Sequence, residues 1–333
     1  MATRQGWAKA ARAMRAAQLA GASNVPSSVS SGAAAALMRA PEGSAWAPVT
    51  PFGDRASSGL LAVKLRMKSV KNVQKITKAM KMVAASKLRG AQAGMENSRG
   101  FWQPFTAMFG DGVHVEPSKN LIVALTTDKG LCGGINSNII KYIRALVKVA
   151  EGVEYPRTEL LAINGEKGRS VLQRDLSEKI VLSVADTQKV ALNFSVASLV
   201  AEKILESAEF DRAQIVFNRF ASVISYKPTI STVMSTKVLT ESLRDKFDQY
   251  EWEDGMEDAL QDLSELQLAG VMYNSMLENA TSEMGARMSA MDNSTRNATD
   301  MLGKLTLLYN RGRQAAITTE LIEIISGASA LEG

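Results

Sequence analysis

The stretch with the clearest chemical potential is glycine-rich: residues 127–134 read TDKGLCGG and follow an apolar run. A glycine-rich loop between a strand and a helix can hold a phosphate group on its backbone N–H groups. The spacing here matches neither GxGxxG nor GxxxxGK[ST], the loops that bind dinucleotides and nucleoside triphosphates. We therefore favour a tight turn that brings the helix close to the sheet, with a nucleotide-binding loop at Gly130–Gly134 as the alternative.

The residues that most often carry catalysis are scarce, because the chain has one cysteine, Cys132, and one histidine, His114. An internal disulfide and a cysteine metal cluster are therefore excluded, and the usual zinc sites and Ser-His-Asp or Cys-His catalysis lack their residues. No neighbouring base supports a reactive Cys132 thiol. We interpret His114, in a loop between Gly112 and Pro117, as a surface residue without a role. Carboxylates with catalytic spacing are explained equally well as surface charge, so we expect no catalytic residue, cofactor or metal.

The composition of the 333 residues, 46% hydrophobic and 22% charged, is typical of a globular protein with one or two domains. The longest apolar runs, such as Leu121–Leu125, have the length of a strand and not the roughly 20 residues that a membrane helix requires. We therefore expect any membrane association to come through a partner.

The first 58 residues differ from the rest in composition. They are rich in alanine and serine, and residues 2–20 could form a basic amphipathic helix. Their basic residues are Arg4, Lys9, Arg12, Arg15, Arg39 and Arg55, and their acidic residues are Glu42 and Asp54. This pattern predicts an organelle transit peptide over about residues 1–58, with a retained disordered tail as the alternative. Four of the chain's five net positive charges lie there, so the high pI does not indicate nucleic-acid binding.

Two segments without proline, residues 52–103 and the chain after Pro228, are free to form long helices. We expect the first helix over residues 60–100, with an apolar stripe and a separate lysine stripe at helical spacing. The apolar stripe consists of Val73, Ile76, Met80, Val83 and Leu88, and the lysine stripe of Lys64, Lys68, Lys71, Lys75 and Lys78. The lysine stripe is either a solvated face or a surface for an acidic partner.

The second long helix is expected over residues 256–331. Its seam steps by four and three residues, which predicts a coiled coil; an ordinary core helix is the alternative, but such helices seldom exceed about 25 residues. The seam consists of Met284, Met288, Met291, Thr295, Ala298, Leu302, Leu305, Tyr309, Gly312, Ala316 and Thr319. Residues 247–286 hold ten acidic residues and no lysine or arginine. We expect the two helices to pair antiparallel, with many ion pairs of about 0–1 kcal/mol each selecting the register.

The middle of the chain, residues 118–240, alternates between strand and helix patterns. Strands are expected at 121–126, 159–163, 180–184 and 214–220, and helices at 136–149 and 190–207. This alternation predicts an α/β domain with a largely parallel, Rossmann-like sheet. Residues 223–238 suit an edge strand, where Pro228 is tolerated. The predicted fold is thus a long antiparallel coiled coil of the two terminal helices plus a central α/β domain.

Four stretches resemble the gamma subunits of F-type ATP synthases and occur in the family's order. They read KITKAMKMVAASKL at 75–88, DKGLCGGIN at 128–136, ARMSAMDN at 286–293, and YNRGRQAAIT through ELIEIISGA at 309–328. The resemblance covers residues 60–331. It implies a central stalk whose coiled coil threads a ring of three alpha and three beta subunits. The α/β domain would sit on the proton-driven membrane c-ring beside delta and epsilon subunits, and nucleotide and magnesium would be bound by the partners.

The resemblance also implies roles for particular residues. Arg313 and Gln314 match positions that hydrogen-bond a loop of the beta subunit, and Thr318 lies one turn further along. Met82 and Lys87 match the opposing stretch of the first helix near the same contact. The glycine loop lies near the beta subunits' levers below the ring. The apolar tip would turn in an apolar sleeve, and its residues are Ile317, Leu321, Ile322, Ile324 and Ile325. Tyr250 and Glu253 match the foot on the c-ring.

Together with the leader, the resemblance implies a peripheral protein on the matrix side of the mitochondrial inner membrane. Its membrane association would come only through the c-ring, and no nucleic acid is expected as a partner. The inserted segment with paired cysteines of the chloroplast version is missing, so no thiol switch is expected. Two other hypotheses remain open: a nucleotide-dependent enzyme that uses Gly130–Gly134, and a coiled-coil scaffold unrelated to energy conversion.

Overall fold

The structure is a computed structural model that describes residues 55–109, 118–152, 158–239 and 256–332. These residues belong to one compact unit, residues 54–333. Residues 1–54 of the predicted leader, the surface histidine at position 114 and the predicted ring foot lie outside the described residues, whereas residues 55–58 already belong to a helix.

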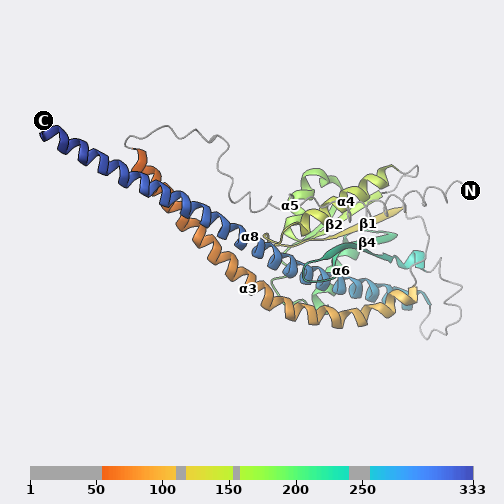
Figure 1. Ribbon diagram of the computed structural model, residues 1–333. Helices are drawn as coiled ribbons and strands as arrows, with labels where there is room; N and C mark the ends of the chain where they lie inside the picture. The colour runs from red at the N-terminus through yellow and green to blue at the C-terminus, as the bar shows by residue number, and fades with distance from the viewer. Residues whose placement is uncertain (1–54, 110–117, 153–157, 240–255, 333) are drawn as a thin grey trace, which may run out of the picture. The chain divides into compact units, whose positions relative to one another are not determined.

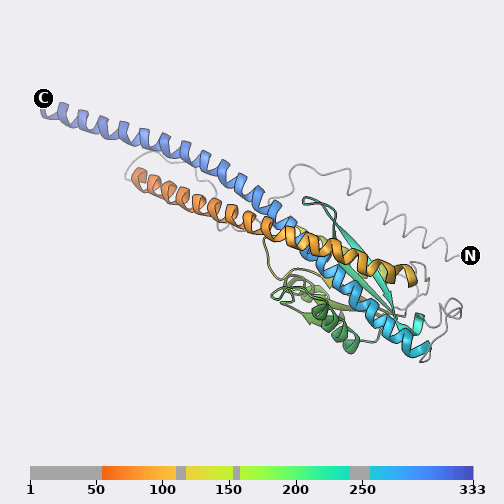
Figure 2. The same ribbon diagram turned by 90° about the horizontal axis from the view of Figure 1, so that it is seen from below.

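Two long helices dominate the described chain. Helix α3 spans Arg55–Phe109 and helix α8 spans Met256–Glu332, with 55 and 77 residues. They lie side by side and run antiparallel, as Figures 1 and 2 show in two views. At about 1.5 Å per residue, α8 is on the order of 115 Å long. The predicted pairing of the two chain ends is therefore confirmed.

The predicted seam of α8 is the face that meets α3. Each residue of the seam is buried or half-buried, whereas Leu307, Leu308 and Arg313 are exposed. The seam holds small residues where the helices approach closely: a Cβ added to Gly312 would lie 3.0 Å from a methyl carbon of Leu60 on α3. The four-and-three spacing thus identified the correct face.

The predicted apolar stripe of α3 is right only in part, because Val73, Ile76 and Val83 are exposed while Met80 is half-buried and Leu88 is buried. The buried residues of α3 include small and polar ones. They are Val70, Thr77, Ala84, Leu88, Met95 and Ser98. Hydrophobicity alone misplaced most of this face, since close helix packing here also uses threonine, alanine and serine.

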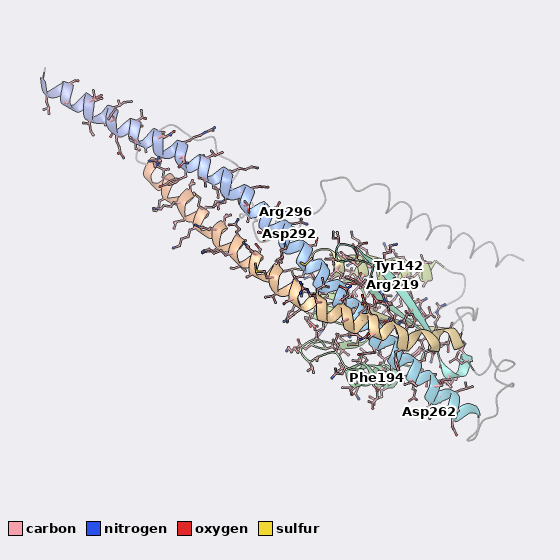
Figure 3. The ribbon with its side chains drawn as sticks, turned by 60° about the horizontal axis from the view of Figure 1, so that its bottom comes forward. Tyr142, Phe194, Arg219, Asp262, Asp292 and Arg296 are labelled. Atoms are coloured by element: carbon pink, nitrogen blue, oxygen red, sulfur yellow. The ribbon has the colours of Figure 1, made fainter. Side chains whose placement is uncertain are left out.

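Ion pairing does not explain the register of the two helices. Within the described ranges, two ion pairs join α3 to α8, Lys81–Asp292 and Arg99–Glu278. The lysine stripe is exposed, and Asp262 in the early, acidic part of α8 is exposed too (Figure 3). The expected summation of many ion pairs is therefore wrong, and packing along the seam sets the register.

A five-stranded sheet forms the centre of the α/β domain. Its strands are β1 (Lys119–Leu125), β2 (Thr158–Asn164), β3 (Ile180–Val184), β4 (Arg212–Phe220) and β5 (Tyr226–Met234). Their order is β3-β2-β1-β4-β5; the first four are parallel and β5 is an antiparallel edge strand that contains Pro228. The predicted Rossmann-like sheet and its edge strand are confirmed.

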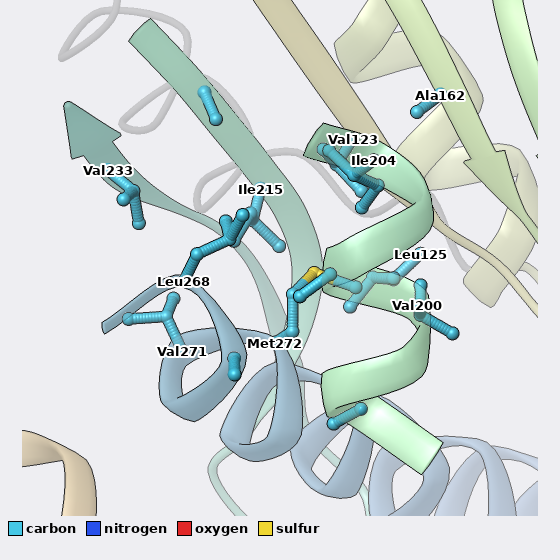
Figure 4. Packing of buried hydrophobic residues seen from close by; sticks show 14 of the residues in the cluster. Val123, Leu125, Ala162, Val200, Ile204, Ile215, Val233, Leu268, Val271 and Met272 are labelled. Carbon is cyan, nitrogen blue, oxygen red and sulfur yellow. The ribbon is translucent and has the colours of Figure 1, made fainter. Parts of the chain in front are cut away.

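Helices cover both faces of the sheet. They are α4 (Ile135–Glu151), α5 (Glu166–Asp175) and α6 (Phe194–Ser207), with a short 3-10 turn, Ser177–Lys179, before β3. Residues of α4 and α5 pack on one face. On the other face α6 and the early part of α8 build the larger core, where Leu268 and Met272 meet Ile215 and Val200 (Figure 4). Helix α8 is thus both a core helix of the domain and half of the coiled coil.

No helix among the described residues has the length and apolar character needed to cross a bilayer. The sequence analysis missed α5, whose only larger apolar residues are Val171 and Leu172. Its helical pattern is therefore too weak to recognise from periodicity.

Candidate partner-contact surface

Three predicted contact residues of α8, Arg313, Gln314 and Thr318, are exposed. They follow Gly312, which still packs on Leu60 of α3. The Thr318 hydroxyl donates to the backbone carbonyl of Gln314 at 2.9 Å, and the side chains of Arg313 and Gln314 are exposed to solvent. This group, called the upper contact below, is available to a partner.

The apolar tip of α8 follows the upper contact. Its predicted bearing residues are each more than half exposed: Ile317, Leu321, Ile322, Ile324 and Ile325. Leu331, near the end of the helix, is 90% exposed. A contiguous apolar surface of this kind marks an interaction site on a folded protein.

Met82 and Lys87 are exposed on α3, but the structure does not bring them to the upper contact. The ion pair of Lys81 with Asp292, 2.6 Å long, places Met82 opposite residue 291 of α8. Arg313 lies 22 residues further along, which is about 33 Å of helix. The expectation of a single shared contact is wrong, and the predicted residues form two separate levels.

The glycine loop lies at the level of Met82 and Lys87. Arg287 of α8 donates from Nη2 to the carbonyl of Gly130 at 3.4 Å, and a Cβ added to Gly133 would lie 3.8 Å from the Cβ of Ala290. The register that pairs Lys81 with Asp292 puts these α8 residues opposite residues 82–87 of α3. The loop and the exposed side chains of Met82 and Lys87 thus lie at the same level along the two helices, as a candidate lower contact.

Side-chain hydrogen bonds within the glycine loop hold its backbone in place. The side chain of Asn136 accepts from the Thr127 N–H at 3.1 Å and donates to the Thr127 hydroxyl at 2.7 Å. Leu131 and Gly133 both have φ of 65°, and Leu131 is 42% exposed. Glycine at position 133 therefore adopts the left-handed conformation without the steric cost that a Cβ atom would add. These contacts agree with a structural turn.

Cys132 is buried inside the same loop, with its Sγ 3.7 Å from the Thr127 hydroxyl. Burial raises the pKa of this thiol above its ordinary value. The thiolate is the nucleophilic form of cysteine, so the surroundings of Cys132 oppose the reactivity that the sequence left open.

A second strand-to-helix loop packs its backbone very closely on Thr126, and the sequence analysis missed it. Gly165 has φ of 116°, and Cβ atoms added to Gly165 and Gly168 would lie 2.6 Å and 2.4 Å from the Thr126 hydroxyl oxygen. That hydroxyl accepts from the Gly168 N–H at 3.1 Å. The signal was present as two glycines in the run NGEKG directly after a strand.

A buried ion pair on α8 was also missed. The carboxylate of Glu283 pairs with Arg287, and Glu283 is 1% exposed. The Gln188 side chain lies beside the same carboxylate. Burial raises the pKa of the Glu283 carboxyl, while Arg287 acts in the opposite direction.

Among the described residues, neither the metal-ligating side chains nor the recess beside α8 supports the enzyme alternative. In the parts of the chain that the structure describes, no group of three His, Cys, Asp or Glu residues could hold a metal. A recess beside α8, lined by Thr126, Asn164, Gln188 and Asn279 among others, has room for about one water molecule. It is therefore far smaller than a pocket for a small-molecule ligand.

The fold and its exposed surfaces define a class: a two-helix shaft protein that carries one α/β domain. The family model for ATP synthase matches residues 59–331. The chain belongs to the ATP synthase gamma-subunit family.

Similar proteins include two plant mitochondrial subunits. The ATP synthase subunit gamma of Arabidopsis thaliana is 52% identical over 298 residues, covering 85% of this chain and 91% of that protein. The subunit of Ipomoea batatas is 54% identical over 278 residues, covering 81% and 85%.

Solved structures show the same fold. A chain in the cryo-EM structure of the Tetrahymena thermophila mitochondrial ATP synthase central stalk and c-ring has a TM-score of 0.55 and 29% identity, covering 66% of this chain and 98% of its own length. A chain in the Euglena gracilis mitochondrial ATP synthase structure of OSCP, F1 and c-ring has a TM-score of 0.71 over 83% of this chain and 95% of its own length, at 24% identity.

Proposed function

We propose that this chain is the central rotor shaft of a mitochondrial, proton-translocating ATP synthase. It couples rotation of the membrane c-ring to the conformational cycling of the catalytic beta subunits. One observation carries the proposal: in a chain of the gamma family, α3 and α8 pair along a continuous seam and α8 continues past α3 with exposed polar and apolar residues. Two long helices packed on each other and on a sheet form a body that can transmit torsion.

The two contact levels suit a rotor. A shaft must favour one of several partner conformations at each angle, which requires different contact energies in the different states. It must also release each contact as it turns. Exposed polar groups such as Arg313, Gln314, Lys87 and Thr318 meet both demands, since a single hydrogen bond contributes only about 0.5–1.5 kcal/mol net. The apolar tip makes non-directional contacts, which resist rotation least.

The proposed partners are three alpha and three beta subunits around the coiled coil, delta and epsilon beside the domain, and the c-ring beneath it. The chain's place would be the matrix side of the mitochondrial inner membrane, with the c-ring as its membrane contact. Tyr250 and Glu253 stay a prediction for the ring foot. In this proposal the chain itself is not catalytic and the partners hold nucleotide and magnesium. The support comes from the family and from the related Tetrahymena thermophila structure of the central stalk and c-ring.

Purification of a tagged copy of the chain from mitochondria tests the proposal. We expect alpha and beta subunits to dominate the co-purifying protein, together with the c-ring in mild detergent. The preparation should hydrolyse ATP, and inhibition of the c-ring should slow that hydrolysis. A tagged chain that is recovered without alpha and beta subunits would contradict the proposal and favour the unrelated scaffold.

A further inference from the structure

Three elements meet in a closed ring of hydrogen bonds where the coiled coil joins the domain. Arg99 of α3 donates from Nε to Oε1 of Glu278 on α8 at 2.6 Å, and from a terminal nitrogen to the carbonyl of Phe220 at 2.9 Å. The N–H of Phe220, the last residue of β4, donates to Oε2 of Glu278 at 2.7 Å. Both carboxylate oxygens and both backbone groups of Phe220 are therefore engaged.

The Glu278 carboxylate, on which the ring closes, is shielded from water. The Glu278 side chain is 2% exposed and that of Arg99 is 31% exposed. The Phe220 side chain packs with Leu88 and Met95 of α3 and Leu277 of α8. A buried carboxylate is strongly disfavoured unless it is paired and hydrogen-bonded, so Glu278 constrains its two partners to stay in place.

Further polar contacts tie α8 to β4 beside the ring. The Asn218 amide donates to Asn279 at 3.0 Å, and the Ser282 hydroxyl donates to the carbonyl of Asn218 at 2.9 Å. On the other side of α8, the Ser98 hydroxyl of α3 donates to Asn274 at 3.0 Å. One stretch of α8 thus exchanges directional bonds with both α3 and the sheet.

Directional bonds add a restraint to that of the apolar core. Interdigitated apolar side chains already limit how far a helix can slide or turn on a sheet, and hydrogen bonds further restrict the helix's angle about its own axis. Charge-assisted hydrogen bonds are strong and geometrically specific. A shaft that passes torque between the α/β domain and the upper contact must not turn or slide on the domain, and the described polar contacts oppose that motion.

We propose that Glu278 is a positioning residue for torque transfer, which locks α3 and α8 to β4 so that the domain and the coiled coil turn as one body. The inference rests on the proposed rotor function. It names the residue that keeps the coiled coil and the α/β domain in a fixed relative orientation. Lys81–Asp292 is different, because it joins α3 to α8 alone and both side chains are partly exposed, at 42% and 27%.

The test compares Glu278→Gln with the control Asp292→Asn in the whole synthase, purified and reconstituted into vesicles. Glutamine keeps the size of the side chain but removes its charge and one acceptor. We expect Glu278→Gln to lower the number of protons pumped per ATP hydrolysed at equal subunit content, and Asp292→Asn to leave it unchanged. Hydrogen exchange of the Phe220 amide in the complex should become about 30- to 100-fold faster in Glu278→Gln.

Unchanged pumping per ATP in an assembled Glu278→Gln synthase would overturn the inference and leave the proposed function standing. If Glu278→Gln fails to assemble, Arg99→Lys decides, because lysine keeps the charge but loses the fork that reaches both Glu278 and Phe220. That variant should show the same loss of pumping in a weaker form, and normal coupling would overturn the inference. Absence of the wild-type chain from any synthase would instead refute the proposed function.

Discussion

The hydroxyl of Thr295 on α8 donates a hydrogen bond of 2.8 Å to the hydroxyl of Thr77 on α3, inside the seam between the two helices. One turn away, the Gln74 amide of α3 donates to the Thr299 hydroxyl at 2.7 Å. A polar residue inside a coiled-coil seam specifies register at some cost in stability. These contacts, and not the lysine stripe, are the polar groups that align this part of the two helices.

A Thr77→Val substitution should destabilise the full chain by about 1 kcal/mol, because the Thr295 hydroxyl loses its partner across the seam. The loss stays moderate since Thr295 can still donate to the carbonyl of Met291, 2.7 Å away. Combining Thr77→Val with Thr295→Val should cost less than the sum of the single changes. Urea unfolding of the variants measures the difference, with exposed Thr318→Val as the control; strictly additive losses would contradict the coupling.

Glu283 should make stability depend on pH. Because burial raises its pKa above the ordinary 4.5, the folded chain binds a proton more tightly than the unfolded chain does. This contribution is fully present below about pH 4.5 and is lost as pH rises through the raised pKa. Above pH 4.5 the free energy of unfolding should therefore fall less steeply with pH in Glu283→Gln than in the wild type. The two slopes should differ by at most about 1.4 kcal/mol per pH unit.

Denaturant unfolding between pH 4 and pH 8 measures this slope. Exposed Glu320→Gln serves as the matched control and should leave the slope as it is in the wild type. Loss of the partner of Arg287 lowers the stability of Glu283→Gln at every pH, so the comparison concerns the slope and not the absolute value. Parallel curves for Glu283→Gln and the wild type would contradict the prediction.

Sequence periodicity was enough where one physical demand decides the pattern. The α8 seam from Met284 to Thr319 was found because it must bury one face, and β1 was found because it is apolar and buried on both faces. On α3 two demands compete: Ile76 and Val83 are apolar but exposed, and the face toward α8 holds Thr77 and Ala84. A rule based on hydrophobicity alone cannot separate a surface kept for partners from a surface that packs within the chain.

The arrangement of the candidate contact residues could not be predicted from the sequence. Motif similarity pointed to Met82 and Arg313, yet their separation of about 33 Å follows from the pairing of Lys81 with Asp292. The ring around Glu278 joins residues 99, 220 and 278, which no spacing in the sequence connects. Contacts between distant segments depend on the folded register, and the sequence carried no local sign of them.

Gly168→Ala should destabilise the chain by about 1–3 kcal/mol, because the new Cβ would meet the Thr126 side chain at 2.4 Å. Gly90→Ala is the matched control, since Gly90 is also helical but has no atom within 4 Å of an added Cβ. It should stabilise the chain by about 0.5–1 kcal/mol, as alanine favours helices. Thermal unfolding measures both, and equal effects would contradict the close approach of α5 to Thr126.

The two contact levels should act independently on the synthase. Replacing Arg313 and Gln314 by alanine should lower coupled ATP turnover about tenfold, since a few polar anchors carry much of an interface. These side chains are exposed, so the chain's own stability should change by less than about 0.5 kcal/mol. Alanine at the exposed neighbours Asn310 and Arg311, which precede Gly312 on the same helix, provides the control.

Replacing Met82 and Lys87 by alanine should lower turnover separately, through the lower contact. Because the levels lie about 33 Å apart along the helices, the free-energy losses of the two double variants should add within about 0.5 kcal/mol in the quadruple variant. Steady-state ATP hydrolysis and synthesis by purified, reconstituted complexes measure the losses. A quadruple variant that is no more impaired than the less active of the two double variants would mean that both pairs serve one contact. That result would contradict the separation that follows from the register of α3 and α8.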